Sequence, residues 1–291
     1  MRKNPRQNLS RLLFILGHPV AHSLSPAMQN AAFKKAGLPW LYLPMDISTG
    51  QIKTAIRHLK RVAFGGANVT VPHKEAILSQ LDYVEPSAKW LGSVNTLYWK
   101  GKKLCGTSTD GEGFLRSLGK FRKRLKGSRG ILLGAGGAAK AVAGALAAEK
   151  VKGFWVANRS LGRAQQLTRI LRSRFPKLEV EAVRLRDGEK YLPVSQWVVQ
   201  ATSIGLKQGD PSPLSLQSAP SSLWVVDLIY HHPTALLNEA RRRGLARLDG
   251  VGMLLHQGAL SFEKWTGKQA PLPVMRKALL DSLASRKGRR R

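Results

Sequence analysis

The 291-residue sequence predicts an α/β fold with two domains, at least one of them built on a parallel sheet. Three observations support this prediction. Short apolar runs alternate with helical patterns from the beginning of the chain, which favours βαβ construction. The length and the 43% hydrophobic content allow two cores of ordinary size. A glycine-rich turn at residues 134–139 joins an apolar run to an alanine-rich stretch, as strands and helices are joined in parallel sheets.

The first elements follow in chain order. Residues 12–16 form an apolar run that predicts a buried strand. Ser-Pro at the start of residues 25–35 predicts the N-terminus of a helix. Residues 40–47 alternate between apolar and other side chains as a strand does, and the apolar positions of residues 52–59 have helical spacing. These four segments predict two βα units.

Polar side chains gather after the next strand. Pro72 ends that strand, which brings Asn68 and Thr70 to its end. Lys74 then falls in the first turn of a predicted helix, where the dipole disfavours a cation. We therefore expect Lys74 to have an acidic partner, an anionic ligand or an easier loss of its proton. Asp110 lies in a glycine-rich polar turn before another apolar helix, where it could also be an N-cap.

The glycine-rich turn predicts a Rossmann-type phosphate site. Gly134 permits a tight turn, and Gly136 lets the backbone approach a pyrophosphate. The small Ala139 lets the helix pack closely on the strand, and the helix N-terminus supplies N–H donors. The alternative is a helix that merely crosses a strand at short range, so the context of the turn must decide.

The next strand provides that context. Residues 154–157 form an apolar run that ends at Asn158, where an NAD site normally has an acid for the ribose hydroxyls. Arg159 follows, with Arg163 one helical turn further on, and guanidinium groups suit a phosphate dianion. The sequence therefore predicts NADP as the cofactor.

Further elements complete the Rossmann-type unit and extend beyond it. A helix begins at Leu161, and later strands are expected near residues 178–183, 197–201 and 223–229. The final helical pair is predicted at residues 253–265 and 274–284.

Composition limits the other possibilities. The sequence has 48 Lys and Arg against 17 Asp and Glu, a net charge of +31 that attracts anionic substrates and, without specificity, nucleic acid. The charge is dispersed and no nucleic-acid module accompanies it. The single cysteine, Cys105, excludes an internal disulfide, agrees with a reducing cytoplasm and is expected to be buried. No apolar run has the length of a membrane span.

Several ordered blocks resemble one family. They are Gly17–Pro26, Asn68–Glu75, Gly92–Thr96, Thr109–Gly111, the turn from Gly134, Asn158–Ser160, Ala201–Gly205, Asp227–Tyr230 and Asp249–Gln257. Together they resemble the shikimate dehydrogenase family from about residue 12 to residue 284. The resemblance implies an N-terminal mixed or parallel α/β substrate domain, a Rossmann-type NADP-binding domain and C-terminal helices that return to the first domain.

The resemblance also implies roles for individual residues. Lys74 and Asp110 would be catalytic, and Ser23 and Ser25 would hold the substrate carboxylate. The other substrate contacts would be Thr70, Asn95, Gln257 and, more weakly, Tyr230. The residues implied to bind NADP are Gly134, Ala135, Gly136, Gly137, Ala138, Asn158, Arg159, Ser160, Arg163, Thr202, Leu228, Gly250 and Met253. No metal is implied.

The expected domains and activity follow from the same resemblance. Residues 12–110, completed by 252–285, would form the substrate-binding catalytic domain, and 111–251 the NADP-binding domain, with basic tails at 1–11 and 286–291. The expected reaction is the reversible NADPH-dependent reduction of 3-dehydroshikimate to shikimate in the shikimate pathway. Reduction of a ring ketone needs a proton donor beside the hydride donor, which suits a Lys–Asp pair. We expect the protein to be cytoplasmic and to be a monomer or a homodimer.

Three alternatives stay open at this point. A quinate or quinate/shikimate dehydrogenase would share the Lys–Asp pair, although Ser25 and Arg159 favour shikimate and NADP. The basic charge allows a secondary role in nucleic-acid binding, and a third possibility is a noncatalytic relative that only binds ligand. Three departures from the family pattern bear on affinity: Ser108 and Gln200 stand where Asn is usual, and the loop after Tyr230 is one residue short.

Overall fold

The computed structural model describes residues 11–62 and 64–288 and divides into two compact units. Unit 1 contains the chain up to Thr109 and from Leu254 onward, and unit 2 runs from Asp110 to Met253. The sequence placed these boundaries after residues 110 and 251. The first boundary between the units coincides with the start of helix α4 (Asp110–Ser117), and the second lies inside helix α8 (Val251–Thr266).

Unit 1 is built on a mixed six-stranded sheet of order β2-β1-β3-β5-β6-β4. The pairs β1–β2 and β1–β3 are parallel, whereas β5 runs antiparallel to both β3 and β6. The ends of β1 and β3 therefore lie side by side with the beginning of β5, which brings their polar flanking residues together. The strands are β1 (Arg11–Gly17), β2 (Trp40–Asp46), β3 (Gly66–Val69), β4 (Tyr83–Val84), β5 (Thr96–Lys100) and β6 (Lys103–Thr107).

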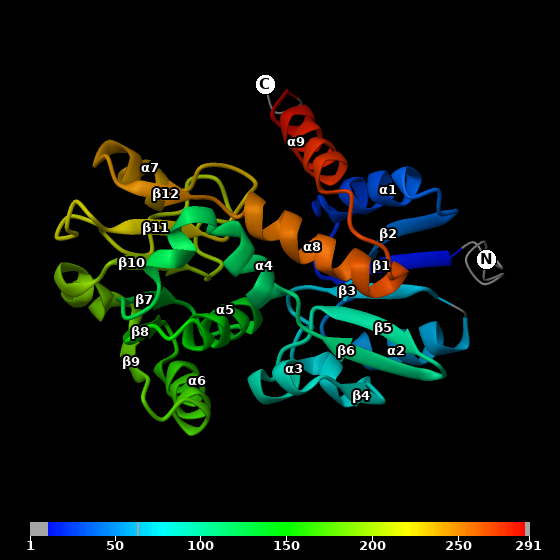
Figure 1. The fold of residues 1–291 in the computed structure, drawn as a ribbon, viewed down its shortest axis with the longest axis horizontal. Helices are drawn as coiled ribbons and strands as arrows, with labels where there is room; N and C mark the ends of the chain where they lie inside the picture. Colours follow the sequence, from blue (N-terminus) through cyan, green and yellow to red (C-terminus); the bar gives the residue numbers. More distant parts are fainter. Residues whose placement is uncertain (1–10, 63, 289–291) are drawn as a thin grey trace. The chain divides into compact units, whose positions relative to one another are not determined.

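Helices from both ends of the chain pack in unit 1. In the N-terminal part they are α1 (Ser25–Lys35), α2 (Ile52–Arg61), the 3-10 helix η2 (Ala76–Gln80) and α3 (Pro86–Leu91). From the C-terminal part come most of α8 and all of α9 (Leu272–Gly288). Helix α9 lies along α1 (Figure 1), so the predicted return of the last helices is observed.

Unit 2 has a fully parallel sheet of order β12-β11-β10-β7-β8-β9. The chain starts in the middle at β7 and builds outward in both directions, so the strand order reverses between β7 and β10. Open α/β sheets bind ligands at the carboxyl ends of strands at such a point. The strands are β7 (Arg129–Leu133), β8 (Gly153–Asn158), β9 (Glu179–Arg184), β10 (Trp197–Gln200), β11 (Trp224–Asp227) and β12 (Ala246–Leu248).

Two long helices of unit 2, α5 (Gly137–Ala148) and α6 (Leu161–Arg174), begin shortly after β7 and β8. The short connections place helix N-termini at the carboxyl edge of the sheet. Besides α4, α5 and α6, the helical segments are the 3-10 helices η3 (Gly119–Arg124) and η4 (Leu185–Val194) together with α7 (Ala235–Arg242).

The prediction of a helix at Lys74 was wrong. Residues 71–75 form a turn, and only the short η2 follows. The Lys74 carbonyl accepts a hydrogen bond from the backbone N–H of Val94 at 2.9 Å, so a neighbouring segment uses an acceptor that a helix would have used itself. The helix-dipole argument therefore does not apply to this lysine.

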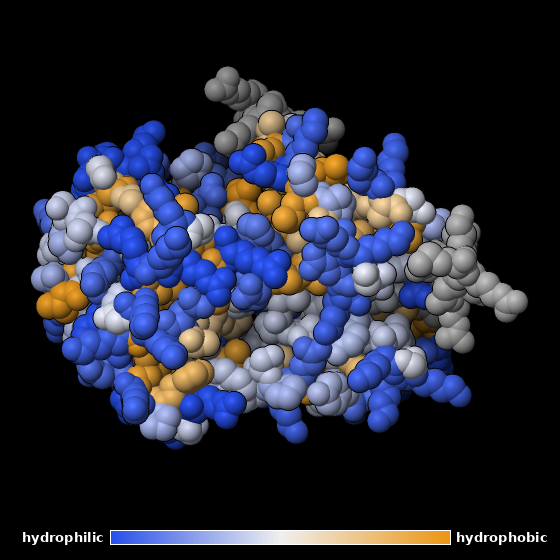
Figure 2. All heavy atoms as spheres, viewed as in Figure 1, coloured by the Kyte–Doolittle hydropathy of each residue, from blue (hydrophilic) through white to orange (hydrophobic). Residues whose placement is uncertain are grey.

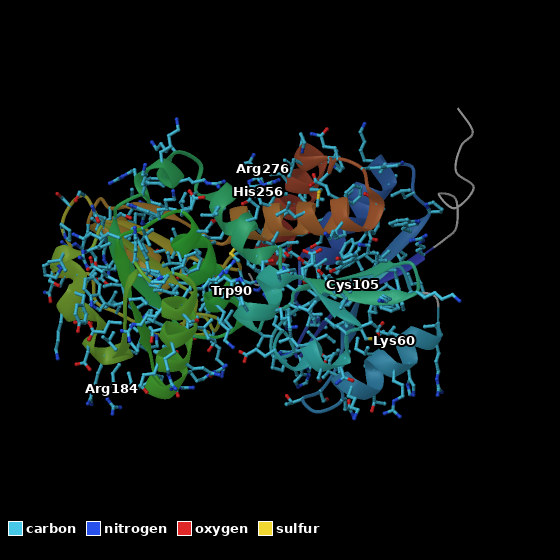
Figure 3. All side chains as sticks on the ribbon, turned by 60° about the horizontal axis from the view of Figure 1, so that its bottom comes forward. Lys60, Trp90, Cys105, Arg184, His256 and Arg276 are labelled. Carbon is cyan, nitrogen blue, oxygen red and sulfur yellow. The ribbon has the colours of Figure 1, made fainter. Side chains whose placement is uncertain are left out.

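The composition is reflected in what is buried and what is exposed. Cys105 lies on β6 (Figure 3) and is 1% exposed, as expected, and burial raises the pKa of its thiol. Hydrophilic side chains cover much of the face in Figure 2. Within residues 11–62 and 64–288, no helix has the length and apolar character needed to cross a membrane.

The return of α8 to unit 1 depends on a glycine. Gly66 has φ +150°, and a Cβ atom there would lie 2.6 Å from Nε1 of Trp265 and 2.8 Å from the carbonyl oxygen of Leu97. The same indole N–H donates to that carbonyl at 2.8 Å. A side chain at position 66 would therefore displace the tryptophan and break its hydrogen bond.

We predict that Gly66→Ala lowers the free energy of unfolding by about 2 kcal/mol or more, because the backbone and the indole cannot both stay in place. The control is Gly162→Ala on α6, where an added Cβ meets nothing within 4 Å and a better helix former is introduced. Urea unfolding of both variants measures the effect. Equal loss of stability in the two variants would contradict the explanation.

Candidate active site in two half-sites

A buried hydrogen-bond network lies at the centre of unit 1. The side chain of Asn95 donates to Oγ1 of Thr109 at 2.9 Å and to Oε1 of Gln257 at 3.2 Å, and it accepts from the Thr109 backbone N–H at 2.8 Å. Ser261, one turn after Gln257 on α8, binds the Gln257 carbonyl at 3.0 Å and Nδ2 of Asn68 at 2.9 Å. The network fixes β3, the start of β5, the crossing at Thr109 and α8 in one arrangement.

The segments that carry the two predicted catalytic residues adjoin this network. Lys74 is half-buried. Its carbonyl accepts a hydrogen bond from the backbone N–H of Val94, the residue directly before Asn95. Asp110 is 3% exposed and follows Thr109 as the first residue of α4, where the helix dipole favours an acid. Lys74 belongs to unit 1, and Asp110 is the first residue of unit 2.

The predicted carboxylate-binding serines lie on the loop between β1 and α1. The hydroxyl oxygen of Ser23 accepts from the backbone N–H of Ser25 at 3.2 Å, at the start of α1. Asp46 at the end of β2 holds the other end of the loop, binding Nδ1 of His18 at 2.5 Å and the N–H of Val20 at 3.2 Å. The hydrogen bond with His18, followed by that from Val20, lowers the pKa of Asp46.

Thr70 lies against the beginning of the same loop. A Cβ atom on Gly17 would come within 2.4 Å of the Thr70 methyl group, so only glycine allows this approach. The backbone N–H of His18 also donates to the Val71 carbonyl at 3.0 Å. Unit 1 thus brings the serine loop and the segment that carries Thr70 and Lys74 into direct contact.

The glycine turn of unit 2 has the geometry of a phosphate cradle. Gly134 has φ +114°, and a Cβ atom there would lie 2.9 Å from the Ala201 carbonyl oxygen. Gly136 is the N-cap of α5 and, as a glycine, has no side chain of its own to cap the helix. A Cβ atom at Gly136 would meet nothing within 4 Å, so open space lies in front of the helix N-terminus. These features fit a dinucleotide pyrophosphate.

The predicted 2′-phosphate residues lie where β8 gives way to α6. Asn158 ends β8, and its side chain donates to the Ser160 carbonyl at 2.8 Å, which shapes the turn. Arg159 is exposed on that turn, and no Asp or Glu of the described residues pairs with it. Arg163 is in the first turn of α6, where the dipole favours a bound anion. Basic groups without an acid at the strand end suit NADP.

Gln200, one of the departures from the family pattern, supports the predicted nicotinamide side. Its Nε2 donates to the Ile204 carbonyl at 2.7 Å, and its Oε1 accepts from the Thr202 backbone N–H at 2.9 Å. The longer amide therefore braces the turn that carries Thr202. In the other departure, Ser108, the buried Oγ has no hydrogen-bond partner among the described residues.

Asp227 ties together the segments after β11. It accepts hydrogen bonds from the Ile229 backbone N–H at 3.0 Å and from Oγ1 of Thr234 at 2.7 Å. Burial raises its pKa to about 6, although these bonds act in the opposite direction. Because Thr234 is also the N-cap of α7, the short loop after Tyr230 is fixed at its far end.

Gly250 has a packing reason of its own. A Cβ atom there would lie 2.0 Å from the carbonyl oxygen of Leu228, so these two predicted cofactor residues touch through their backbones. Met253 follows on α8 and is 7% exposed.

The sequence did not predict the roles or burial of three polar residues, although Thr109 stood in the block Thr109–Gly111. Thr109 and Ser261 are hubs of the network in unit 1, and Lys140 is a buried cation on α5, 7% exposed. Only Ser261 left a usable signal, since it lies four residues after Gln257 and therefore on the same helix face.

Comparison with known proteins finds similarity along nearly the whole chain. A shikimate dehydrogenase (NADP(+)) of Methanopyrus kandleri is 42% identical over 278 residues, which cover 92% of this chain and 94% of that protein. Family models described as shikimate dehydrogenase substrate binding domain, shikimate/quinate 5-dehydrogenase and shikimate 5'-dehydrogenase C-terminal domain match residues 15–97, 117–228 and 250–280. The chain belongs to the shikimate dehydrogenase family. It is therefore an oxidoreductase of an NADP-using family, as the sequence predicted.

Solved structures of the family have the same fold. Shikimate 5-dehydrogenase from Thermus thermophilus, in complex with NADP(H) and shikimate, has a TM-score of 0.81 and 38% identity, covering 94% of this chain and 99% of that one. Quinate dehydrogenase from Corynebacterium glutamicum, in complex with NAD, has a TM-score of 0.86 and 32% identity, covering 94% and 99%. The predicted two-domain α/β fold is confirmed.

Two glycines of the turn should affect different properties, one the binding of the cofactor and the other the stability of the fold. We predict that Gly136→Ala leaves the unfolding midpoint unchanged but raises KM for NADP about tenfold, because the methyl group takes the space of one phosphate contact. Gly134→Ala should lower the unfolding midpoint instead, because of its positive φ and the Ala201 carbonyl. Thermal unfolding and KM are measured on both variants. An unchanged KM in Gly136→Ala would exclude the turn from cofactor binding.

Proposed function

We propose that this protein is an NADP-dependent shikimate dehydrogenase. It catalyses the reversible reduction of 3-dehydroshikimate to shikimate with NADPH, within the shikimate pathway that leads to chorismate and the aromatic amino acids. The observation that carries the proposal is that Lys74 and Asp110 stand at their motif positions in a chain that is 42% identical to a shikimate dehydrogenase (NADP(+)) along almost its whole length.

The proposed chemistry uses one proton and one hydride. NADPH supplies the hydride to the ring carbonyl carbon. The Lys74 ammonium group gives its proton to the carbonyl oxygen as the alkoxide develops, and it regains a proton from water. Asp110 orients this ammonium group and stabilises its charge. In the direction of oxidation the same lysine takes the proton from the shikimate hydroxyl.

Substrate binding is assigned to unit 1. The hydroxyl groups of Ser23 and Ser25 hold the carboxylate, and Thr70, Asn95 and Gln257 surround the ring hydroxyls. The network supports a positioning role for Asn95, since its amide already binds Thr109 and Gln257. Tyr230 in unit 2 is proposed as a further contact with the ring.

Cofactor binding is assigned to unit 2. The backbone of residues 134–138 receives the pyrophosphate, and Asn158, Arg159, Ser160 and Arg163 receive the adenosine 2′-phosphate. Thr202, Leu228, Gly250 and Met253 lie on the nicotinamide side. The preference for NADP over NAD rests on two arginines where an NAD site has an acid.

A quinate dehydrogenase is the second candidate, because that enzyme from Corynebacterium glutamicum has the same fold. Quinate carries an additional hydroxyl group near the carboxylate and needs different space there. Ser25 at the start of α1 is only 3% exposed, and Arg159 offers a cation to the 2′-phosphate that NADP has and NAD lacks, so both residues favour shikimate with NADP.

The finer assignments are proposals as well. A single buried thiol suits a reducing cytoplasm. The subunit is proposed to work as a monomer or homodimer, and the net charge of +31 to attract nucleic acid only without specificity.

Lys74 gives the sharpest test of the proposed chemistry. We predict that Lys74→Ala lowers kcat at least about a hundredfold, the loss expected for a missing acid–base group, while NADP affinity is retained. The matched control is Lys89→Ala, an exposed lysine on α3, which should behave as wild type. Turnover is followed by NADPH absorbance. Near-wild-type turnover of Lys74→Ala would remove the lysine from the mechanism.

Arg159 tests the cofactor assignment independently. We predict that Arg159→Ala raises KM for NADP by about tenfold to a hundredfold, the value of a charge-assisted phosphate contact, and leaves KM for NAD nearly unchanged. Arg174→Ala, which removes an exposed arginine from the other end of α6, is the control. A parallel loss with both cofactors would show that Arg159 does not recognise the phosphate.

A further inference from the structure

An arginine from the C-terminal helix α9 forms hydrogen bonds with the loop between β1 and α1, which carries the predicted carboxylate-binding serines. The guanidinium group of Arg286 donates through Nη1 to the His22 carbonyl and through Nη2 to the Ser23 carbonyl, the latter at 3.2 Å. The basic composition of residues 286–291 predicted a tail that includes residue 286. In the structure it belongs to α9, which runs to Gly288 along α1.

The two hydrogen bonds restrain one short segment. The planar guanidinium fork binds two successive carbonyl groups, so it fixes the orientation of the peptide between them as well as its position. That peptide leads directly into Ser23, whose hydroxyl oxygen accepts from the N–H of Ser25. Any rotation of the peptide would therefore turn the hydroxyl groups on which carboxylate binding depends.

The N–H of the His22–Ser23 peptide is held within the loop, where it donates to the Val20 carbonyl at 2.9 Å, and Arg286 restrains the carbonyl side. A hollow of about 300 Å³ separates the loop from α9, with Leu24 and Ala27 on one wall and Asp281, Ser282 and Ser285 on the other. Arg286 bridges this hollow by its hydrogen bonds. Asp46 restrains the opposite end of the loop, at His18 and Val20.

The charge of Arg286 is also well suited to the task. Asp281, the acid that lines the same hollow, is paired with Lys277 at 2.7 Å. No Asp or Glu in the described part of the chain forms an ion pair with Arg286. Its positive charge therefore adds to the attraction of a carboxylate to two neutral serine hydroxyls.

We propose that Arg286 is a positioning residue for substrate binding: it holds the His22–Ser23 peptide so that Ser23 and Ser25 meet the substrate carboxylate, and it contributes positive charge beside them. This inference rests on the proposed function. It assigns a binding task to the C-terminal end of α9, which carries none of the family motifs identified in the sequence.

The test compares four proteins: wild type, Arg286→Ala, Arg286→Lys and the control Arg276→Ala. Arg276 lies on the same helix (Figure 3), is exposed and has the same charge, but no hydrogen bond joins it to the loop within the described residues. We expect Arg286→Ala to raise Kd and KM for shikimate about tenfold, with kcat within about twofold of wild type and KM for NADP unchanged. Arg286→Lys should restore part of the affinity, and Arg276→Ala should match wild type.

A double-mutant cycle shows whether the effect passes through the serine. The Kd of shikimate is measured by calorimetry without cofactor. In a Ser23→Ala background, Arg286→Ala should raise this Kd less than about threefold, because the hydroxyl group that Arg286 positions is already absent. Full additivity of the two losses would overturn the proposal. An unchanged Kd in Arg286→Ala would also overturn it, whereas a wild type without shikimate binding or turnover would instead refute the proposed function.

Discussion

The buried amide of Asn95 is the interaction on which the substrate half of this protein depends. It accepts from the backbone of Thr109 and donates to Gln257, so it joins residues 14 and 162 positions away in the chain. Its neighbour Val94 binds the Lys74 backbone, and Thr109 precedes Asp110. A single planar group thus anchors the segments of both proposed catalytic residues. Because it is buried at 2% exposure, loss of either partner would leave an unsatisfied polar group and be costly.

The cofactor half depends on a different constraint, the close approach of backbone to backbone. Gly134 and Gly250 each stand where a Cβ atom would collide with a carbonyl oxygen, that of Ala201 and that of Leu228. Packing at these places aligns the loops at the carboxyl edge of the parallel sheet. The proposed binding of the cofactor phosphates uses main-chain donors and the arginines that follow β8. The two half-sites are therefore stabilised differently: by a network of side-chain hydrogen bonds in unit 1, and by close backbone contacts at glycines in unit 2.

Periodicity and motifs in the sequence predicted most of the framework. The turn at Gly134 and the buried strand before it were predictable because glycine spacing reports a local backbone requirement. The helix expected at Lys74 was not found, since its backbone acceptor is used by Val94, a partner 20 residues away that no local pattern reveals. The roles of Thr109 and Ser261 were missed for the same reason: they depend on contacts with Asn95 and Asn68, which are distant in the chain. Arg286 was assigned to a tail because a run of basic residues has the composition of a solvated end.

The most direct test of the central claim is a steady-state assay of the purified protein in the direction of oxidation, which crosses shikimate and quinate with NADP and NAD. The account predicts that turnover occurs chiefly with shikimate and NADP. A preference for quinate would contradict the role given to Ser25, and a preference for NAD the role given to Arg159. Absence of turnover with all four combinations would contradict the catalytic assignment as a whole.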